Sequence, residues 1–185
     1  HPSAVRAVAT NTFRIAKNAA GFLPQAQAAL GFPIDIIGGH EEARLIYLGV
    51  AHVLPASSQP RLVIDIGGGS TEFIIGRNMT PERLESLKLG CVSMSVRFFG
   101  DGSLRADAFA AAETHARAEI EAIARAFGRE HWHEAFASSG TALALAAILV
   151  VIWWPADLFN AGFQLSFLCV AALLLFTRPV SRWIM

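Results

Sequence analysis

The stretch RLVIDIGGGSTEFIIG, residues 61–76, constrains the fold most, because it places an acid and three consecutive glycines between two apolar segments. Both segments have strand length and are rich in isoleucine and valine, so the sequence predicts two strands joined by a glycine turn. One interpretation is a tight hairpin turn with an Asx-type aspartate. Three glycines are costly in a mere turn, since glycine loses the most conformational freedom on folding. They therefore favour a ligand that approaches the backbone closely.

The turn has the composition of an anion site. Without Cβ atoms, successive backbone N–H groups can point into one concavity, and neighbouring hydroxyl groups add donors. The predicted phosphate-binding residues are Gly67, Gly68, Gly69, Ser70 and Thr71. The turn is not a Walker A loop, because no Gly-Lys-Ser/Thr follows, and it is not a dinucleotide fingerprint, because a strand follows it.

Two acids flank the glycines. Asp65 ends an apolar strand, where a carboxylate is costly unless it is paired, hydrogen-bonded or bound to a metal. Glu72 lies close enough in sequence to share a cation with it. Hard cations such as Mg²⁺ prefer oxygen ligands and share them with phosphates, so both acids are candidate metal ligands.

A second acid pair, Glu41 and Glu42, opens a predicted helix after a strand and the glycines Gly38 and Gly39. Acids in a first helical turn complement the helix dipole and are common on surfaces. With a phosphate loop nearby, one of them could instead orient and deprotonate a water that attacks phosphorus.

The order of the remaining segments predicts an α/β fold, because strands and helices alternate around an antiparallel hairpin. Pro24 is predicted to start a helix that ends at Gly31. The segment SSGTA, residues 138–142, is either an anion nest or a strand-to-helix connection with Thr141 as N-cap. The predicted strands are 5–10, 32–38, 62–67, 71–77, 83–90 and 134–138, and the predicted helices begin at 11, 24, 39, 106 and 141.

Composition changes abruptly near Ala142. The chain of 185 residues is 54% hydrophobic with a mean hydropathy of +0.44, but from Leu143 onward the only formal charges are Asp157, Arg178 and Arg182. We therefore divide the chain into residues 1–59, 60–142 and 143–185, with residues 55–61 as a linker. The net charge of zero gives no bulk attraction to nucleic acid.

Five blocks between Val5 and Ala142 resemble the Ppx/GppA family of exopolyphosphatases and guanosine pentaphosphate phosphohydrolases. They are AVATNTFRIAKNA, IDIIGGHEEARLIYLGV, LVIDIGGGSTEFIIG, ESLKLGCVSMSVRFF and SSGTA. The resemblance implies the actin-like, sugar kinase and Hsp70 ATPase fold, with two ribonuclease H-like lobes around a cleft. Residues 1–59 would then be the C-terminal part of the first lobe, and residues 60–142 the N-terminal part of the second.

The resemblance also implies a reaction and the residues that perform it. Family members are often homodimeric cytoplasmic enzymes that use Mg²⁺ or a similar cation to hydrolyse a terminal phosphoanhydride of polyphosphate or guanosine pentaphosphate. Glu42 matches the catalytic base, Asp65 and Glu72 match the metal- and water-positioning acids, and Arg14 matches an arginine that faces polyphosphate. Gly38 replaces the serine usual in its block. The family's first phosphate loop would precede His1 and the rest of the second lobe would follow Ala142, so we expect little or no phosphatase activity from a chain that looks like a fragment.

Residues 143–185 read as one or two membrane helices. Residues 158–176 are mostly apolar and close to the length of about 20 residues that a bilayer span needs. Trp153, Trp154, Arg178 and Arg182 resemble interfacial anchors, which would place the segment in an inner membrane. A buried helical hairpin is the soluble alternative. The tail also resembles a transmembrane block of the ComEC competence family, so the chain is interpreted as a chimera rather than as a membrane-anchored phosphatase.

Three functions follow from these patterns. The first is a partial Ppx/GppA phosphohydrolase. The second is a ComEC-like component of DNA uptake that acts through the tail. The third is a non-catalytic module that binds polyphosphate or guanosine polyphosphates through the glycine turn.

Overall fold

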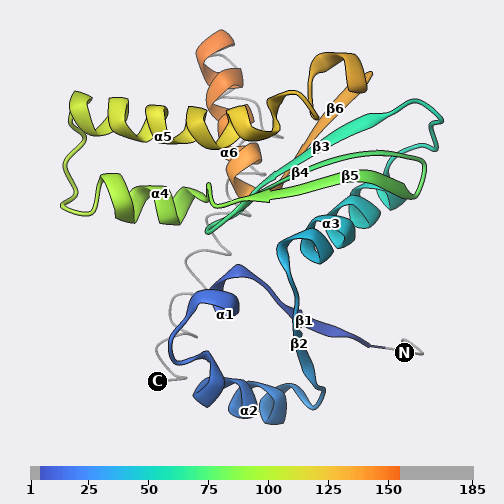
Figure 1. Cartoon of the computed structure of the whole chain (residues 1–185), viewed down its shortest axis with the longest axis vertical. Helices are drawn as coiled ribbons and strands as arrows, with labels where there is room; N and C mark the ends of the chain where they lie inside the picture. The colour runs from blue at the N-terminus through green and yellow to red at the C-terminus, as the bar shows by residue number, and fades with distance from the viewer. Residues whose placement is uncertain (1–4, 155–185) are drawn as a thin grey trace. The chain divides into compact units, whose positions relative to one another are not determined.

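A computed structural model describes residues 5–154 of the chain (Figure 1). The chain divides into one compact unit that ends at Ala142 and another that begins at Leu143, which is also where the composition changes. The first unit contains both predicted lobe fragments and all the predicted site residues. It is described first.

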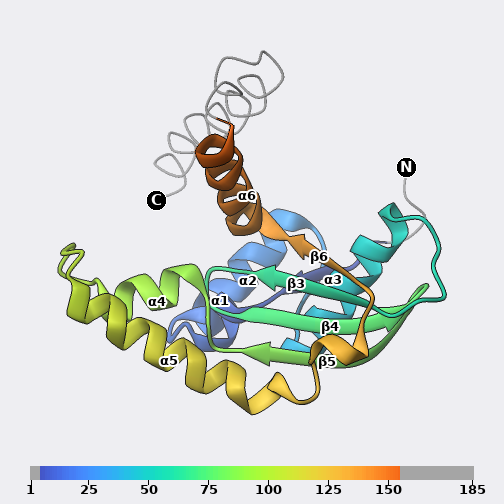
Figure 2. The same ribbon diagram turned by 90° about the horizontal axis from the view of Figure 1, so that it is seen from above.

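A four-stranded sheet forms the larger part of this unit. Its strands are β3 (Arg61–Ile66), β4 (Thr71–Arg77), β5 (Thr80–Leu87) and β6 (Glu134–Ser138), in the order β5-β4-β3-β6. The first three are antiparallel neighbours, and β6 runs parallel to β3 (Figure 2). The predicted hairpin around the glycines is confirmed, and so is the α/β class.

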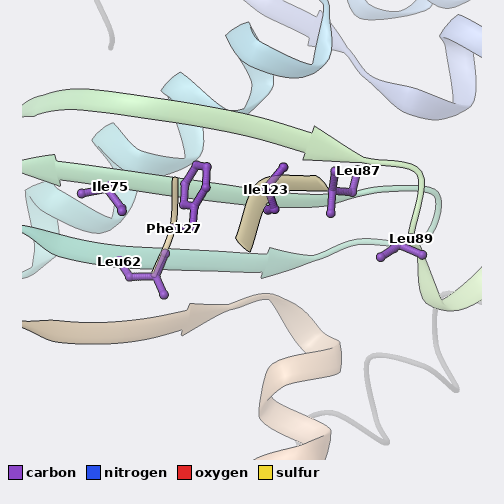
Figure 3. Packing of buried hydrophobic residues seen from close by; sticks show 6 residues of the cluster. All are labelled: Leu62, Ile75, Leu87, Leu89, Ile123 and Phe127. Atoms are coloured by element: carbon purple, nitrogen blue, oxygen red, sulfur yellow. The ribbon is translucent and has the colours of Figure 1, made fainter. Parts of the chain in front are cut away.

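Strands β3 and β4 alternate their side chains between two cores, as the two-residue period of a strand requires. Leu62 and Ile75 face helix α5 (Ala106–Ala124), where they pack with Leu87, Leu89, Ile123 and Phe127 (Figure 3). Val63 and Ile74 face the other way, toward helix α3 (Gly39–Val53), where they pack with Ala43 and Tyr47. The sheet is therefore covered on both faces, and the strand that carries Asp65 is fixed between two helices.

One β-bulge shifts the register between β4 and β5. Ile75 lies opposite Arg83, whereas the next residue, Gly76, lies opposite Pro81. Glu82 is thus an extra residue on β5, with no partner of its own in the ladder. Beyond the bulge the pairing is regular and brings Ser86 opposite Glu72.

The N-terminal part is a parallel pair of short strands with two helices between them. Strands β1 (Ala7–Ala9) and β2 (Ile34–Ile36) are joined through α1 (Asn11–Ile15) and α2 (Ala19–Leu30). The predicted start of a helix at Pro24 is wrong, because α2 begins five residues earlier and Pro24 lies inside it. The predicted end is confirmed: Gly31 adopts a left-handed conformation with φ of 78°, which glycine accepts without strain.

Two further boundaries differ from the prediction. Helix α5 ends at Ala124 rather than near Arg129, and a 3₁₀ turn (Arg129–His131) follows Gly128. Helix α4 (Cys91–Phe98) was not predicted at all. Strand β5 begins at Thr80, three residues before the predicted start.

Helix α6 (Ser139–Trp153) follows β6 directly. Thr141 lies in its first turn and is not the N-cap, so SSGTA is a strand-to-helix connection. No helix among residues 5–154 combines the length and apolarity that a bilayer crossing requires. The predicted membrane segment 158–176, with its anchors Arg178 and Arg182, lies outside the described residues.

Candidate active site

The glycine turn is a four-residue connection between β3 and β4, from Gly67 to Ser70. The Gly67 N–H donates a hydrogen bond to the Ser70 carbonyl at 2.9 Å, which closes the turn. Asp65 and Glu72 are cross-strand partners at its base. The turn therefore lies directly above the two predicted cation-binding acids.

Backbone N–H groups at the N-terminus of helix α4 donate hydrogen bonds to carbonyl groups of this turn. The Cys91 N–H donates to the Gly67 carbonyl at 2.9 Å, and the N–H groups of Val92 and Ser93 donate to the Gly68 carbonyl at 2.9 and 3.0 Å. These are first-turn N–H groups, which have no partner within their own helix. Because α4 holds the carbonyls, the peptide planes of the turn are fixed, and within residues 5–154 no backbone acceptor pairs with the Gly68 and Gly69 N–H groups. Those N–H groups are available to an anion.

Close backbone packing explains the glycine at position 90. A Cβ built on Gly90, immediately before α4, would lie 2.2 Å from the Gly68 carbonyl oxygen and 2.3 Å from the Gly69 nitrogen. A Cβ on Gly69 would lie 1.7 Å from Nδ2 of Asn11 on α1. Gly90 is thus required for α4 to reach the turn, whereas the Asn11 amide beside Gly69 is the end of a side chain that can rotate away. Gly90 followed by apolar residues at 92, 96 and 99 was a signal from which α4 could have been predicted.

Glu72 is the most buried acid of the site, with 1% of its surface exposed. The Ser86 hydroxyl donates to its Oε1 at 2.7 Å. Burial raises the pKa of the Glu72 carboxyl, hydrogen bonds from Ser70 and Ser86 partly oppose this, and repulsion from Glu42 and Asp65 adds to the rise. Burial therefore disfavours the charged form of the Glu72 carboxyl, and the negative charges of Glu42 and Asp65 add to this effect.

Glu42 and Arg14 form an ion pair at the side of the turn. Arg14 Nη1 donates to Oε2 of Glu42 at 3.0 Å and to the Ile37 carbonyl at 2.6 Å. Glu42 belongs to the first turn of α3, and Arg14 lies on α1. The arginine predicted to face polyphosphate is therefore engaged with the predicted base.

A pocket of about 530 Å³ lies between Glu42 and the glycine turn. Glu42 lines it together with the whole glycine turn, Asn11 and Ser93. A second pocket of about 510 Å³ shares Asn11 and Ser70 with the first and is lined by Arg14, His40 and Lys88. The predicted base and the predicted phosphate loop therefore face one space.

Two of the predicted phosphate ligands have other partners. The Thr71 hydroxyl donates to the Leu89 carbonyl, and Thr71 is buried, so this side chain ties β4 to the segment before α4. Ser70 is also buried, and its side chain lowers the pKa of the Glu72 carboxyl. Their hydroxyl groups thus support the site from within the protein, while the backbone of the turn provides the free donors.

The acids suit a small hard cation. No group of three or more metal-binding side chains gathers in the part of the chain that the structure describes. Mg²⁺ needs fewer, since it commonly binds one or two carboxylates and completes its shell with water and substrate phosphate. Asp65 and Glu72 lie opposite each other across the strands, and a cation would offset the cost of burying the Glu72 carboxylate.

Comparison with known proteins decides the family. Residues 1–151 match the model of the Ppx/GppA phosphatase family. This chain belongs to that family. The match extends nine residues beyond Ala142, and nothing in the comparisons supports a ComEC-like origin of the tail.

Solved structures of Ppx/GppA proteins resemble about three quarters of the chain. An exopolyphosphatase-like protein is 29% identical with a TM-score of 0.69, over 76% of this chain and 46% of that one. The Aquifex aeolicus PPX-GPPA enzyme is 28% identical with a TM-score of 0.59, over 77% and 46%. An exopolyphosphatase from Cytophaga hutchinsonii, 24% identical with a TM-score of 0.64 over 78% and 46%, shares the fold. The chain thus spans about half the length of these relatives, and the comparisons confirm the predicted α/β fold of a Ppx/GppA protein.

The burial of Glu72 predicts a pH dependence of stability. The pKa of Glu72 in the folded state is raised above the ordinary value of 4.5. The contribution of this carboxyl to the free energy of unfolding is therefore complete below pH 4.5 and is lost as the pH rises through the folded-state pKa. Glu72→Gln should therefore raise the free energy of unfolding at pH 7.5 by about 1 kcal/mol and leave it nearly unchanged at pH 4. Urea unfolding in EDTA at both pH values measures this.

The matched control is Glu113→Gln, which removes an exposed carboxylate paired with Arg117 on α5. It should change stability little at either pH, because exposed ion pairs contribute little. If Glu72→Gln were destabilising at pH 7.5 in EDTA, Glu72 would be a stabilising buried anion, contrary to the prediction.

Proposed function

We propose that this Ppx/GppA chain binds the terminal phosphate of inorganic polyphosphate or guanosine pentaphosphate on the glycine turn and directs a water molecule at its phosphorus. The observation that carries the proposal is that Glu42 and Gly67–Ser70 line one pocket, with two carboxylates beneath the turn. The family of phosphohydrolases to which the chain belongs supports the same chemistry.

In the proposed reaction the N–H groups of Gly68 and Gly69 hold the phosphate oxygens. Glu42 accepts a proton from a water molecule while the oxygen of that water bonds to phosphorus. The phosphoanhydride bond breaks at the same time, and the substrate shortened by one phosphate leaves with the bonding electron pair. Asp65 and Glu72 would hold Mg²⁺, which neutralises charge on the phosphate oxygens when bound. The carboxylates of the protein alone would repel the substrate, which is why a cation is part of the proposal.

Asp65→Asn tests the binding step. We expect the affinity for tripolyphosphate in the presence of Mg²⁺ to fall at least about tenfold, because one of two anionic cation ligands is lost. Isothermal titration calorimetry with Mg²⁺ and with EDTA measures it. Asp107→Asn, which neutralises an exposed acid on α5 that pairs with Arg105, is the matched control. Mg²⁺-dependent affinity that survives Asp65→Asn would refute the proposal.

Phosphate release from polyphosphate distinguishes catalysis from binding alone. Binding without turnover is the second candidate function, because the Gly68 and Gly69 N–H groups are available to an anion. We expect binding with little or no phosphate release. Turnover near that of a full-length exopolyphosphatase would exclude the non-catalytic module.

Other assignments remain proposals from the sequence. They are a cytoplasmic location and homodimer formation for the phosphatase part, and bilayer contact through residues 143–185. A DNA-uptake role through that tail is the remaining alternative. Mutants confined to the tail should leave tripolyphosphate affinity unchanged if the glycine turn carries the function.

A further inference from the structure

The ion pair between Arg14 and Glu42 places the arginine in contact with the proposed base. Arg14 Nη1 lies 3.0 Å from Glu42 Oε2 and 2.6 Å from the Ile37 carbonyl oxygen. The two side chains are 22% and 16% exposed, so water screens the pair only partly. Hydrogen bonds between two charged groups are about twice as strong as neutral ones, and partial burial strengthens them further.

The same bonds restrict how Glu42 can move. A glutamate side chain has three rotatable bonds and, on the first turn of a helix, would otherwise sample several rotamers. The Ile37 carbonyl anchors the guanidinium to the backbone just before α3, and the guanidinium in turn anchors one carboxylate oxygen. Among the described residues the other oxygen, Oε1, has no side-chain donor, so it is the one that remains for a water molecule.

The neighbouring acid provides a contrast. Glu41 is bound through both oxygens by Arg44, at 2.7 and 2.8 Å, so this guanidinium leaves neither carboxylate oxygen unoccupied. Glu42 is held at one oxygen and lines the pocket of the glycine turn. The two consecutive acids are therefore held differently. The arrangement of Glu41 suits a surface ion pair, and the arrangement of Glu42 suits a base.

We propose that Arg14 is a positioning residue that acts through Glu42 and is not itself a principal ligand of the phosphate. This inference rests on the proposed role of Glu42 as the base. Arg14 lines the second pocket, beside His40, Lys88 and Ser70, whereas Glu42 and Gly67–Gly69 line the first. The guanidinium thus does not line the pocket that Glu42 shares with the Gly68 and Gly69 N–H groups.

The carboxyl ¹³C signal of Glu42 tests the positioning directly. In the full chain labelled with ¹³C-glutamate, the signal that disappears in Glu42→Gln belongs to Glu42. Arg14→Gln should move that signal toward the values of exposed glutamates, and Arg14→Lys, which keeps a charged donor, should restore part of the difference. Arg117→Gln, which breaks the exposed pair with Glu113, should leave the Glu42 signal in place.

Tripolyphosphate affinity separates positioning from ligand binding. In the presence of Mg²⁺, Arg14→Gln should change the dissociation constant less than about threefold, whereas removal of a charged phosphate ligand costs tenfold or more. Any residual rate of phosphate release should fall about tenfold or more in Arg14→Gln, because a misplaced base loses its alignment with the water.

The outcomes are distinct. An unmoved Glu42 signal in folded Arg14→Gln, or a tenfold loss of tripolyphosphate affinity in that variant, would overturn the positioning role. Failure of the unmodified chain to bind tripolyphosphate would instead overturn the proposed function, while the carboxyl signal would still show whether Arg14 holds Glu42.

Discussion

Replacing Gly90 with alanine should abolish tripolyphosphate binding and lower the free energy of unfolding by about 3 kcal/mol. The added Cβ would lie 2.2–2.3 Å from backbone atoms of Gly68 and Gly69, and backbone cannot rotate out of the way as a side chain can. Helix α4 would have to withdraw from the turn, and the carbonyls that it binds would lose their donors. Calorimetric titration and urea unfolding of the variant measure the two effects.

Gly49→Ala is the control for this substitution. Gly49 is exposed within α3, and a Cβ there meets nothing within 4 Å. The variant should bind tripolyphosphate normally and gain about 0.5–1 kcal/mol of stability, because alanine favours the helix more than glycine does. Normal phosphate binding by Gly90→Ala would show that the contact between α4 and the turn is dispensable.

Truncation of Tyr47 to alanine should be the most destabilising change to the α3 core, at about 4 kcal/mol. Tyr47 is 1% exposed and is the largest side chain between α3 and the sheet. Gly76 makes room for it, since a Cβ on that glycine would lie 2.4 Å from the tyrosine ring. Because α3 also carries Glu42, loosening this contact should reach the pocket as well.

Tyr47→Phe isolates the packing from the hydroxyl. It removes only the hydrogen bond to the Asn78 carbonyl, at 3.2 Å, and should cost about 1 kcal/mol in urea unfolding. If the phenylalanine variant were as unstable as the alanine variant, the hydroxyl rather than the ring would hold α3 to the sheet.

The sequence allowed prediction of those elements whose signals are local. Apolar segments of strand length on both sides of Gly67–Gly69 predicted the β3–β4 hairpin, and the periodic apolar residues after Gly39 predicted α3. The convergence of Glu42 with the glycine turn was inferred from a family resemblance, and the structure brings both to one pocket.

Other features depend on contacts between distant residues and could not be predicted in this way. The position of helix α4 against the turn depends on its first N–H groups, which donate to Gly67 and Gly68, more than twenty residues earlier in the chain. The pairing of Arg14 with Glu42 depends on how α1 lies beside α3. The start of α2 was predicted wrongly at Pro24, because proline is common at the first position of a helix but here lies inside one.

The extra residue on β5 determines which side chain meets the buried acid. Without the bulge at Glu82, the pairing from the β4–β5 turn would place Glu85 opposite Glu72, and two like charges would face each other across the strands. With it, that place is taken by Ser86, whose hydroxyl donates to Glu72 at 2.7 Å. A single unpaired residue far from the glycine turn thus places a hydrogen-bond donor, rather than a second carboxylate, opposite Glu72. An insertion or deletion in β5 should therefore change which side chain faces Glu72, and with it the charge next to the buried acid.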